Sequence, residues 1–113
     1  LLPRIVGLKK AKELMFSGEL IGAEEALKIG VINDYFPDEL LEEKTLEVAE
    51  KMAKKAPIAL GLIKSTLNRS FELSFKAALE NEKNLQTICL QTADNKEGIA
   101  AFKEKREADF SGE

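Results

Sequence analysis

Apolar residues recur three and four positions apart along most of the chain, a spacing that predicts helices rather than strands. Leu60, Ile63, Leu67 and Phe71 form the clearest such stripe. The pattern predicts five longer helices and one short one. They run from Ile5 to Phe16, between Gly22 and Gly30, from Asp38 to Lys55, from Pro57 to Ser70, from Ser74 to Leu90, and from Asp94 toward a tail at Asp109.

Glycines and small polar residues mark the ends of these helices. Gly18 and Gly30 follow the last helical residues, where a left-handed glycine commonly closes a helix. Ser74 is expected to cap the helix that it precedes. Asp94 and Glu97 have the spacing of a capping box with an acidic first member.

The last helix and the tail complete the predicted layout. Ile99, Ala100 and Phe102 are expected to face inward from the last helix. The tail from Asp109 to Glu113 is expected to fray, as chain ends commonly do.

One segment is expected to be extended. Val31–Phe36 is rich in β-branched and aromatic residues and precedes Pro37, which disfavours helix at the residue before it. A single strand has no partner within a helical chain, so its backbone groups would need an edge supplied from elsewhere.

The composition is that of a globular protein and excludes several other classes. The chain has 113 residues, of which 44% are hydrophobic and 33% charged, with a formal net charge of −3. This mild acidity argues against nucleic-acid binding, and no apolar run approaches the roughly 20 residues of a membrane span. The single cysteine, Cys89, favours a reducing intracellular compartment such as the cytoplasm. Because the sequence opens abruptly at Leu1 without a methionine, we expect a portion of a longer protein.

Few residues are candidates for catalysis, and none for a metal site. The chain has no histidine, and no glycine-rich segment has the spacing of a phosphate loop. Glu82 shares a helix side with apolar residues and could project into a groove, although a solvated edge or a lysine partner explains it more simply. Asp34 could act in a cleft, but turn chemistry explains it more simply. Cys89 is predicted to be a buried core thiol.

One segment near the end of the sequence combines an aromatic ring with cations. Phe102 and Lys105 are three residues apart on a predicted helix, so the ring and the ammonium would point the same way. Such a pair suits the adenine or a phosphate of a nucleotide. The alternative places Phe102 in the core and makes Lys103, Lys105 and Arg106 a solvated last turn, and spacing alone favours this alternative.

Six short motifs give the chain a family resemblance over its whole length. In order they are Leu2–Gly7, Ser17–Ala26, Gly30–Asn33, Ala56–Ala59, Asn68–Arg69 and Glu97–Arg106. Their order and spacing resemble the enoyl-CoA hydratase/isomerase (crotonase) family. Gly22 departs from the family's usual Ser, Thr or Asp, a replacement that costs only about a few tenths of a kcal/mol at a helix cap.

The resemblance implies a fold class that is mainly α. The chain would be the C-terminal helical portion of a crotonase-type α/β fold, with one short strand-like segment. Residues 1–113 would form a single helical region, without the N-terminal spiral core. In the family that core holds the thioester in an oxyanion hole and carries the catalytic glutamates, so no catalytic residue is expected in this chain. The resemblance also implies that the residues matching Phe102 and Lys105 reach the CoA of a neighbouring subunit, near its adenine and phosphates. This raises the nucleotide interpretation above the core one.

The resemblance also implies a function. The parent protein would be an enoyl-CoA hydratase, adding water to 2-enoyl-CoA thioesters in fatty-acid metabolism, with acyl-CoA as substrate and no separate cofactor. The chain would support assembly of a homotrimer or hexamer and supply part of the CoA site, without activity alone. Two alternatives are an enoyl-CoA isomerase and a non-catalytic helical module for oligomerisation or protein interaction. The acyl chain and the choice among cytosol, mitochondrion and peroxisome stay open.

Overall fold

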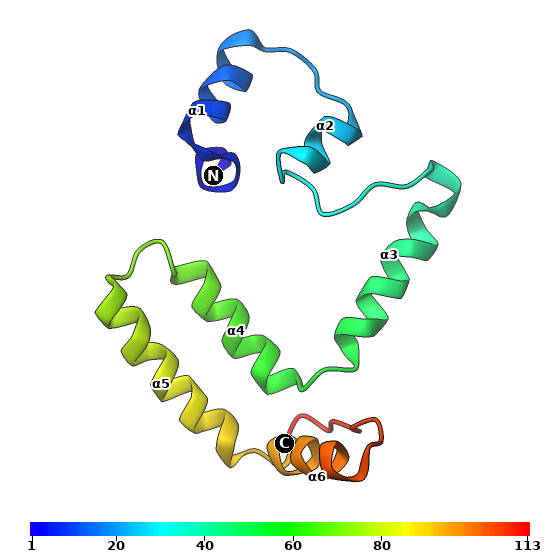
Figure 1. Ribbon diagram of the computed structural model, residues 1–113, viewed down its shortest axis with the longest axis vertical. Coiled ribbons are helices and arrows are strands. Elements are labelled where there is room, and N and C mark those ends of the chain that lie inside the picture. Colours follow the sequence, from blue (N-terminus) through cyan, green and yellow to red (C-terminus); the bar gives the residue numbers. More distant parts are fainter. The chain divides into compact units, whose positions relative to one another are not determined.

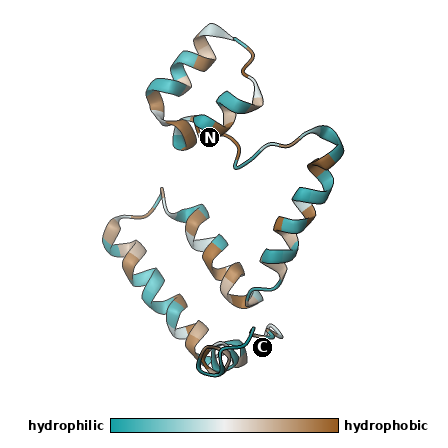
Figure 2. Ribbon diagram, turned by 45° about the vertical axis from the view of Figure 1, so that its right-hand side comes forward, coloured by the Kyte–Doolittle hydropathy of each residue, from teal (hydrophilic) through white to brown (hydrophobic).

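The computed structural model describes residues 1–113 and contains six α-helices and no β-strand (Figure 1). The helices are α1 (Leu2–Ser17), α2 (Ala23–Lys28), α3 (Asp38–Ala53), α4 (Pro57–Arg69), α5 (Phe75–Gln91) and α6 (Ala93–Glu104). Polar and apolar residues are interspersed along each helix, in agreement with the sequence pattern (Figure 2). The prediction of a mainly α chain with five longer helices and one short one is confirmed. No helix has both the length and the apolar character that crossing a membrane requires.

Two compact units make up the chain, residues 1–46 and residues 47–113. The first unit holds α1 and α2. Lys10 of α1 joins the two helices by an ion pair with Glu25 of α2 at 3.2 Å, and its Nζ also lies 2.8 Å from Glu13 within α1. Within α1 the backbone of Gly7 is not helical and kinks the helix. Gly18 closes α1 in the left-handed conformation, with a φ of 63°, as predicted. Whether residues 1–113 act as one helical region stays a prediction.

The predicted strand-like segment at Val31–Phe36 is wrong. These residues form bends and coil, and the hydrogen bonds explain why. Gly30, with a φ of 77°, turns the chain so that the Val31 N–H donates to the Ala26 carbonyl at 2.9 Å. The Tyr35 N–H then donates to the Asp34 carboxylate at 2.9 Å. Local turn bonds therefore take backbone donors that a strand would offer to a neighbour.

The second unit is built on three helices packed in sequence order. α4 contacts α5, and α5 contacts α6. Pro57 is the first residue of α4, and Ser74 caps α5 by accepting the Ala77 N–H at 3.3 Å, so both predicted helix starts are confirmed.

Three expectations for α6 and the tail are wrong. Thr92, not Asp94, caps α6 by accepting the Asn95 N–H at 3.0 Å. The tail is held against α6 rather than frayed, because the Ala93 N–H donates to the Glu113 carbonyl at 2.6 Å. The predicted inward face is also wrong, since Phe102 is exposed and the buried residues of α6 are Asp94 and Ala101.

Candidate functional site

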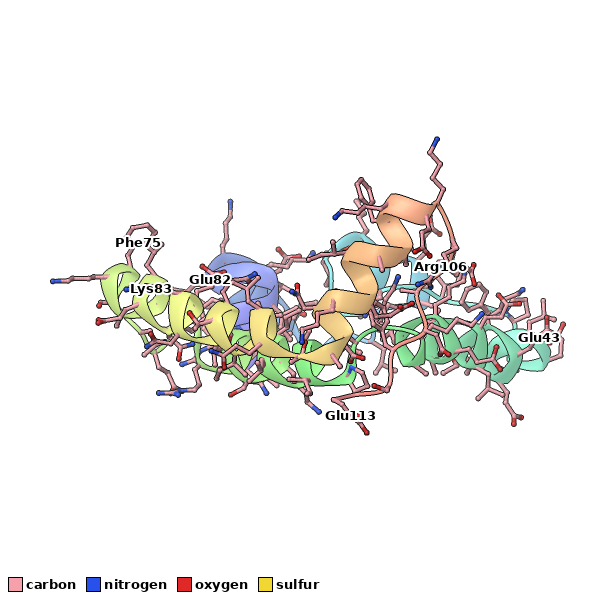
Figure 3. The ribbon with its side chains drawn as sticks, turned by 90° about the horizontal axis from the view of Figure 1, so that it is seen from below. Glu43, Phe75, Glu82, Lys83, Arg106 and Glu113 are labelled. Carbon is pink, nitrogen blue, oxygen red and sulfur yellow. The ribbon has the colours of Figure 1, made fainter.

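The tail returns along α6 from Arg106 to Glu113 (Figure 3). It is fastened near the start of that helix by Asp94. The Asp94 side chain is only 3% exposed. Its carboxylate accepts the Ser111 N–H at 2.8 Å and the Gly112 N–H at 3.1 and 3.2 Å. A buried carboxylate with several backbone donors is well satisfied, so Asp94 has a structural role in holding the tail.

A second fastening lies at the other end of α6. Arg106 donates two hydrogen bonds to the Glu97 carboxylate, at 2.5 and 2.9 Å, and one to Glu104 at 2.6 Å. Glu97 also accepts the Asp109 N–H at 2.9 Å. Chiefly because of Arg106, and then Asp109, the pKa of Glu97 falls from 4.5 to about 2, and the pKa of Arg106 is raised. The planar guanidinium and the carboxylate thus form a two-pronged ion pair at the turn after α6.

The predicted nucleotide pair is divided between the helix and its end. Phe102 belongs to α6 and is 85% exposed. Lys105 lies one residue beyond α6 and has a left-handed backbone, with a φ of 57°. The argument that both side chains share a helical face therefore does not hold, because only Phe102 is helical. Both residues are exposed within a few residues of each other, and their role in CoA binding stays a prediction.

An open hollow of about 480 Å³ lies beside Phe102. Its lining is mostly apolar and comes from the start of α4, the end of α5, α6 and Phe110 of the tail. Asp94 and Lys103 supply charged groups to this lining. The volume falls in the range of small-molecule sites, so Phe102 stands at the edge of a surface that can receive a flat group.

The other candidates do not form a catalytic constellation. Glu82 is exposed and lines a second groove, of about 360 Å³, between α4 and α5. Asp34 is exposed and accepts the N–H of its neighbour, as the turn interpretation predicts. Cys89 is half-buried rather than a buried core thiol, because it lines both the hollow beside Phe102 and the groove between α4 and α5. No group of three or more His, Cys, Asp or Glu side chains in residues 1–113 could hold a metal ion.

Sequence reasoning missed the two fastenings around α6. The spacing of Asp94 and Glu97 predicts a capping box. Their actual partners could not be predicted because they are distant in sequence. The tail amides lie 17 and 18 residues beyond Asp94, and Arg106 lies nine beyond Glu97. The one available signal was the opposite charge of Glu97 and Arg106 near a helix end, which does not identify partners by itself.

Comparisons with known proteins agree on one family. The sequence pattern of the family described as enoyl-CoA hydratase/isomerase matches residues 1–113. The 2,3-dehydroadipyl-CoA hydratase of Escherichia coli K12 is 41% identical over 109 residues, covering 96% of this chain and 43% of that protein. A short-chain-enoyl-CoA hydratase of Clostridioides difficile is 37% identical over 102 residues, covering 90% of this chain and 66% of that protein.

Solved structures give the same result for the fold. The crystal structure of enoyl-CoA hydratase from Bacillus anthracis is similar with a TM-score of 0.94 and 40% identity. The match covers 99% of this chain and 43% of that one, so the chain spans less than half of that structure's length. On the family match over residues 1–113 and these structural likenesses, the chain belongs to the enoyl-CoA hydratase/isomerase (crotonase) family.

Proposed function

We propose that this chain is the C-terminal helical portion of an enoyl-CoA hydratase, which adds water to the double bond of 2-enoyl-CoA thioesters. The similar proteins from E. coli and C. difficile are both named as hydratases of CoA esters, which favours a hydratase over an isomerase. The six helices without a strand support a helical portion of the fold. In this enzyme the oxyanion hole and the catalytic acids would lie in the part of the protein that this chain does not include.

Within that enzyme, Phe102 and Lys105 would hold the nucleotide end of the substrate. The observation that carries this role is the exposure of Phe102, because a ring that is 85% exposed beside an apolar hollow is not a core residue of this unit. Its face is available for stacking on the adenine. The Lys105 ammonium is exposed and supplies the positive charge that a CoA phosphate requires.

Assembly is the second part of the proposed role. Large apolar side chains are exposed on every one of the longer helices, Phe16, Met52, Leu67, Phe75 and Phe102 among them. Surfaces of this kind are commonly covered by other protein surface. We propose a homotrimer or hexamer in the intact enzyme, acyl-CoA as its substrate without a separate cofactor, and an intracellular location.

Steady-state kinetics of the full-length protein with crotonyl-CoA tests the nucleotide role. The double change Phe102→Ala with Lys105→Ala is expected to raise KM by roughly tenfold or more, because stacking and a charged hydrogen bond are each worth about 1 kcal/mol or more. The turnover number kcat is expected to change little, since these contacts are remote from the reacting carbon and equal in ground and transition states. An unchanged KM with a damaged kcat contradicts the nucleotide role.

The same exposed apolar side chains favour one alternative, a non-catalytic helical module for oligomerisation or protein interaction. Hydration of crotonyl-CoA by the full-length protein separates the two functions. Turnover well above the uncatalysed rate supports the enzyme. Its absence, together with self-association in sedimentation experiments, supports the interaction module.

A further inference from the structure

Lys105 has an unusual backbone for a lysine. Among the non-glycine residues it alone has a positive φ, at 57°. The turn that it makes is held by two backbone hydrogen bonds, from Arg106 N–H to the Ala101 carbonyl at 3.1 Å and from Lys105 N–H to the Phe102 carbonyl at 3.4 Å. This pair of bonds is the Schellman ending of a helix, in which glycine is the usual residue at the left-handed position.

The end of α2 provides a direct comparison within the same chain. There Val31 N–H donates to the Ala26 carbonyl at 2.9 Å, and Gly30 N–H donates to the Leu27 carbonyl at 3.0 Å. The bonding pattern is the same, but the left-handed residue is Gly30. A side chain in this conformation crowds the backbone, so Lys105 is strained where Gly30 is not. Strain of this kind persists only where the surrounding structure imposes it, and it gathers at ligand sites.

The surrounding structure that imposes it is the ion pair between Glu97 and Arg106. Arg106 follows Lys105 directly and is tied back to α6 by its two hydrogen bonds to Glu97. Glu97 is also tied to the chain beyond Lys105 through the Asp109 N–H. The peptide that carries Lys105 is therefore fixed to the helix by its own bonds and by those of its neighbours.

The Lys105 ammonium, in contrast, takes part in no ion pair or hydrogen bond within residues 1–113, whereas Arg106 beside it is fully engaged. The structure thus keeps a lysine in a conformation suited to glycine and leaves its charge unused. A helix ending alone does not need this side chain, since Gly30 closes α2 without one.

We propose that Glu97 and Arg106 are positioning residues, which hold Lys105 in its left-handed conformation so that its ammonium meets a phosphate of the CoA nucleotide. This inference rests on the nucleotide role proposed above. Neither Glu97 nor Arg106 needs to touch the ligand, because both act through the backbone of Lys105.

A double-mutant cycle in the full-length protein tests the inference, with KM for crotonyl-CoA as the readout. Glu97→Gln is expected to raise KM by roughly threefold to tenfold, the effect of weakening one charged hydrogen bond, with kcat retained. Lys105→Ala is expected to raise KM at least as much. In the double variant, Glu97→Gln is expected to add nothing further, because the group that it positions is gone.

Two more variants keep the test decisive. Arg106→Lys preserves the charge but loses the two-pronged geometry. It is therefore expected to raise KM when Lys105 is present and to leave KM unchanged in the Lys105→Ala variant. Glu13→Gln is the matched control, since it removes one carboxylate from the pair between Lys10 and Glu13 on α1 and is expected to leave KM unchanged.

The outcomes separate this inference from the proposed function. If Lys105→Ala leaves KM unchanged, the nucleotide role of Lys105 fails, and the positioning role fails with it. If Lys105→Ala raises KM but Glu97→Gln and Arg106→Lys raise it equally with and without Lys105, only the positioning role is overturned. If both variants leave KM at the native value, the positioning role is likewise overturned while the nucleotide role stands.

Discussion

At the scale of single residues, the carboxylate of Glu97 joins α6 both to the turn that follows it and to the tail. It accepts two hydrogen bonds from Arg106 and one from the Asp109 amide, although a quarter of its side chain is exposed. All three donors favour the charged form of the carboxylate, and the guanidinium of Arg106 contributes most. The interaction therefore depends on ionisation of Glu97.

The pH dependence of this ion pair follows from the lowered pKa. Because the folded-state pKa of Glu97 is about 2, below its ordinary 4.5, the stabilisation is complete above pH 4.5 and is lost as pH falls toward 2. Carbon-13 NMR of the Glu97 carboxyl group is expected to give a titration midpoint near 2. Arg106→Ala is expected to move the midpoint upward, and a native midpoint near 4.5 contradicts the ion pair in solution.

Residues with local partners could be predicted from the sequence, and residues with distant partners could not. Gly18, Gly30 and Ser74 end or begin helices as predicted because their bonds reach only three to five residues along the chain. Asp94 was misassigned because its donors lie in the tail. The helical spacing predicts that Phe102 faces inward, yet it is exposed, since periodicity alone does not say which apolar side is covered within this chain.

At the scale of elements, α6 and the tail form one fastened structure. The tail runs back along α6 from Arg106 to Glu113 (Figure 3). Asp94 binds it at one end of the helix, and the Glu97–Arg106 pair holds it at the other. Phe110 lies 3.6 Å from the position where Gly98 would carry a Cβ, which places the tail against the helix between the two fastenings. Helix, turn and tail therefore hold Phe102 and Lys105 at a defined place.

The Asp94 fastening makes a prediction for this element. Asp94→Ala is expected to lower the free energy of unfolding of the full-length protein by about 1–3 kcal/mol, because the Ser111 and Gly112 amides lose a buried acceptor. Urea unfolding measures the loss, and amide hydrogen exchange at Ser111 and Gly112 should accelerate. Asp94→Asn is the matched control, since it keeps one acceptor oxygen and should be milder. Native exchange rates at both amides in Asp94→Ala contradict the fastening.

The segment before α3 shows why the one predicted strand is absent. Its composition favours extended structure, but a strand needs a partner, and residues 1–113 contain none. The left-handed Gly30 turns the Val31 N–H back onto the Ala26 carbonyl of α2, and the Asp34 carboxylate accepts the Tyr35 N–H. Composition predicted a local preference, and the backbone hydrogen bonds decided the outcome.

At the scale of the whole molecule, the chain has many helices and little core. Ala11, Ala26 and Ala101 are its buried apolar residues, while large apolar side chains are exposed on the longer helices. This balance agrees with a chain that matches less than half of the similar B. anthracis structure. Helix positions and family were predictable from the sequence, because both rest on local patterns and motif order. The exposure of these side chains was not predictable, since helical spacing does not say which apolar faces are covered.

The proposed role of this chain is to bind the nucleotide end of a CoA ester whose reacting end binds elsewhere in the enzyme. The most direct test compares two substrates in the full-length protein, crotonyl-CoA and crotonyl-pantetheine, which lacks the nucleotide. The double change Phe102→Ala with Lys105→Ala is predicted to lower kcat/KM for crotonyl-CoA by roughly tenfold or more and to leave kcat/KM for crotonyl-pantetheine at the native value. An equal loss with both substrates, or no loss with crotonyl-CoA, would contradict the claim.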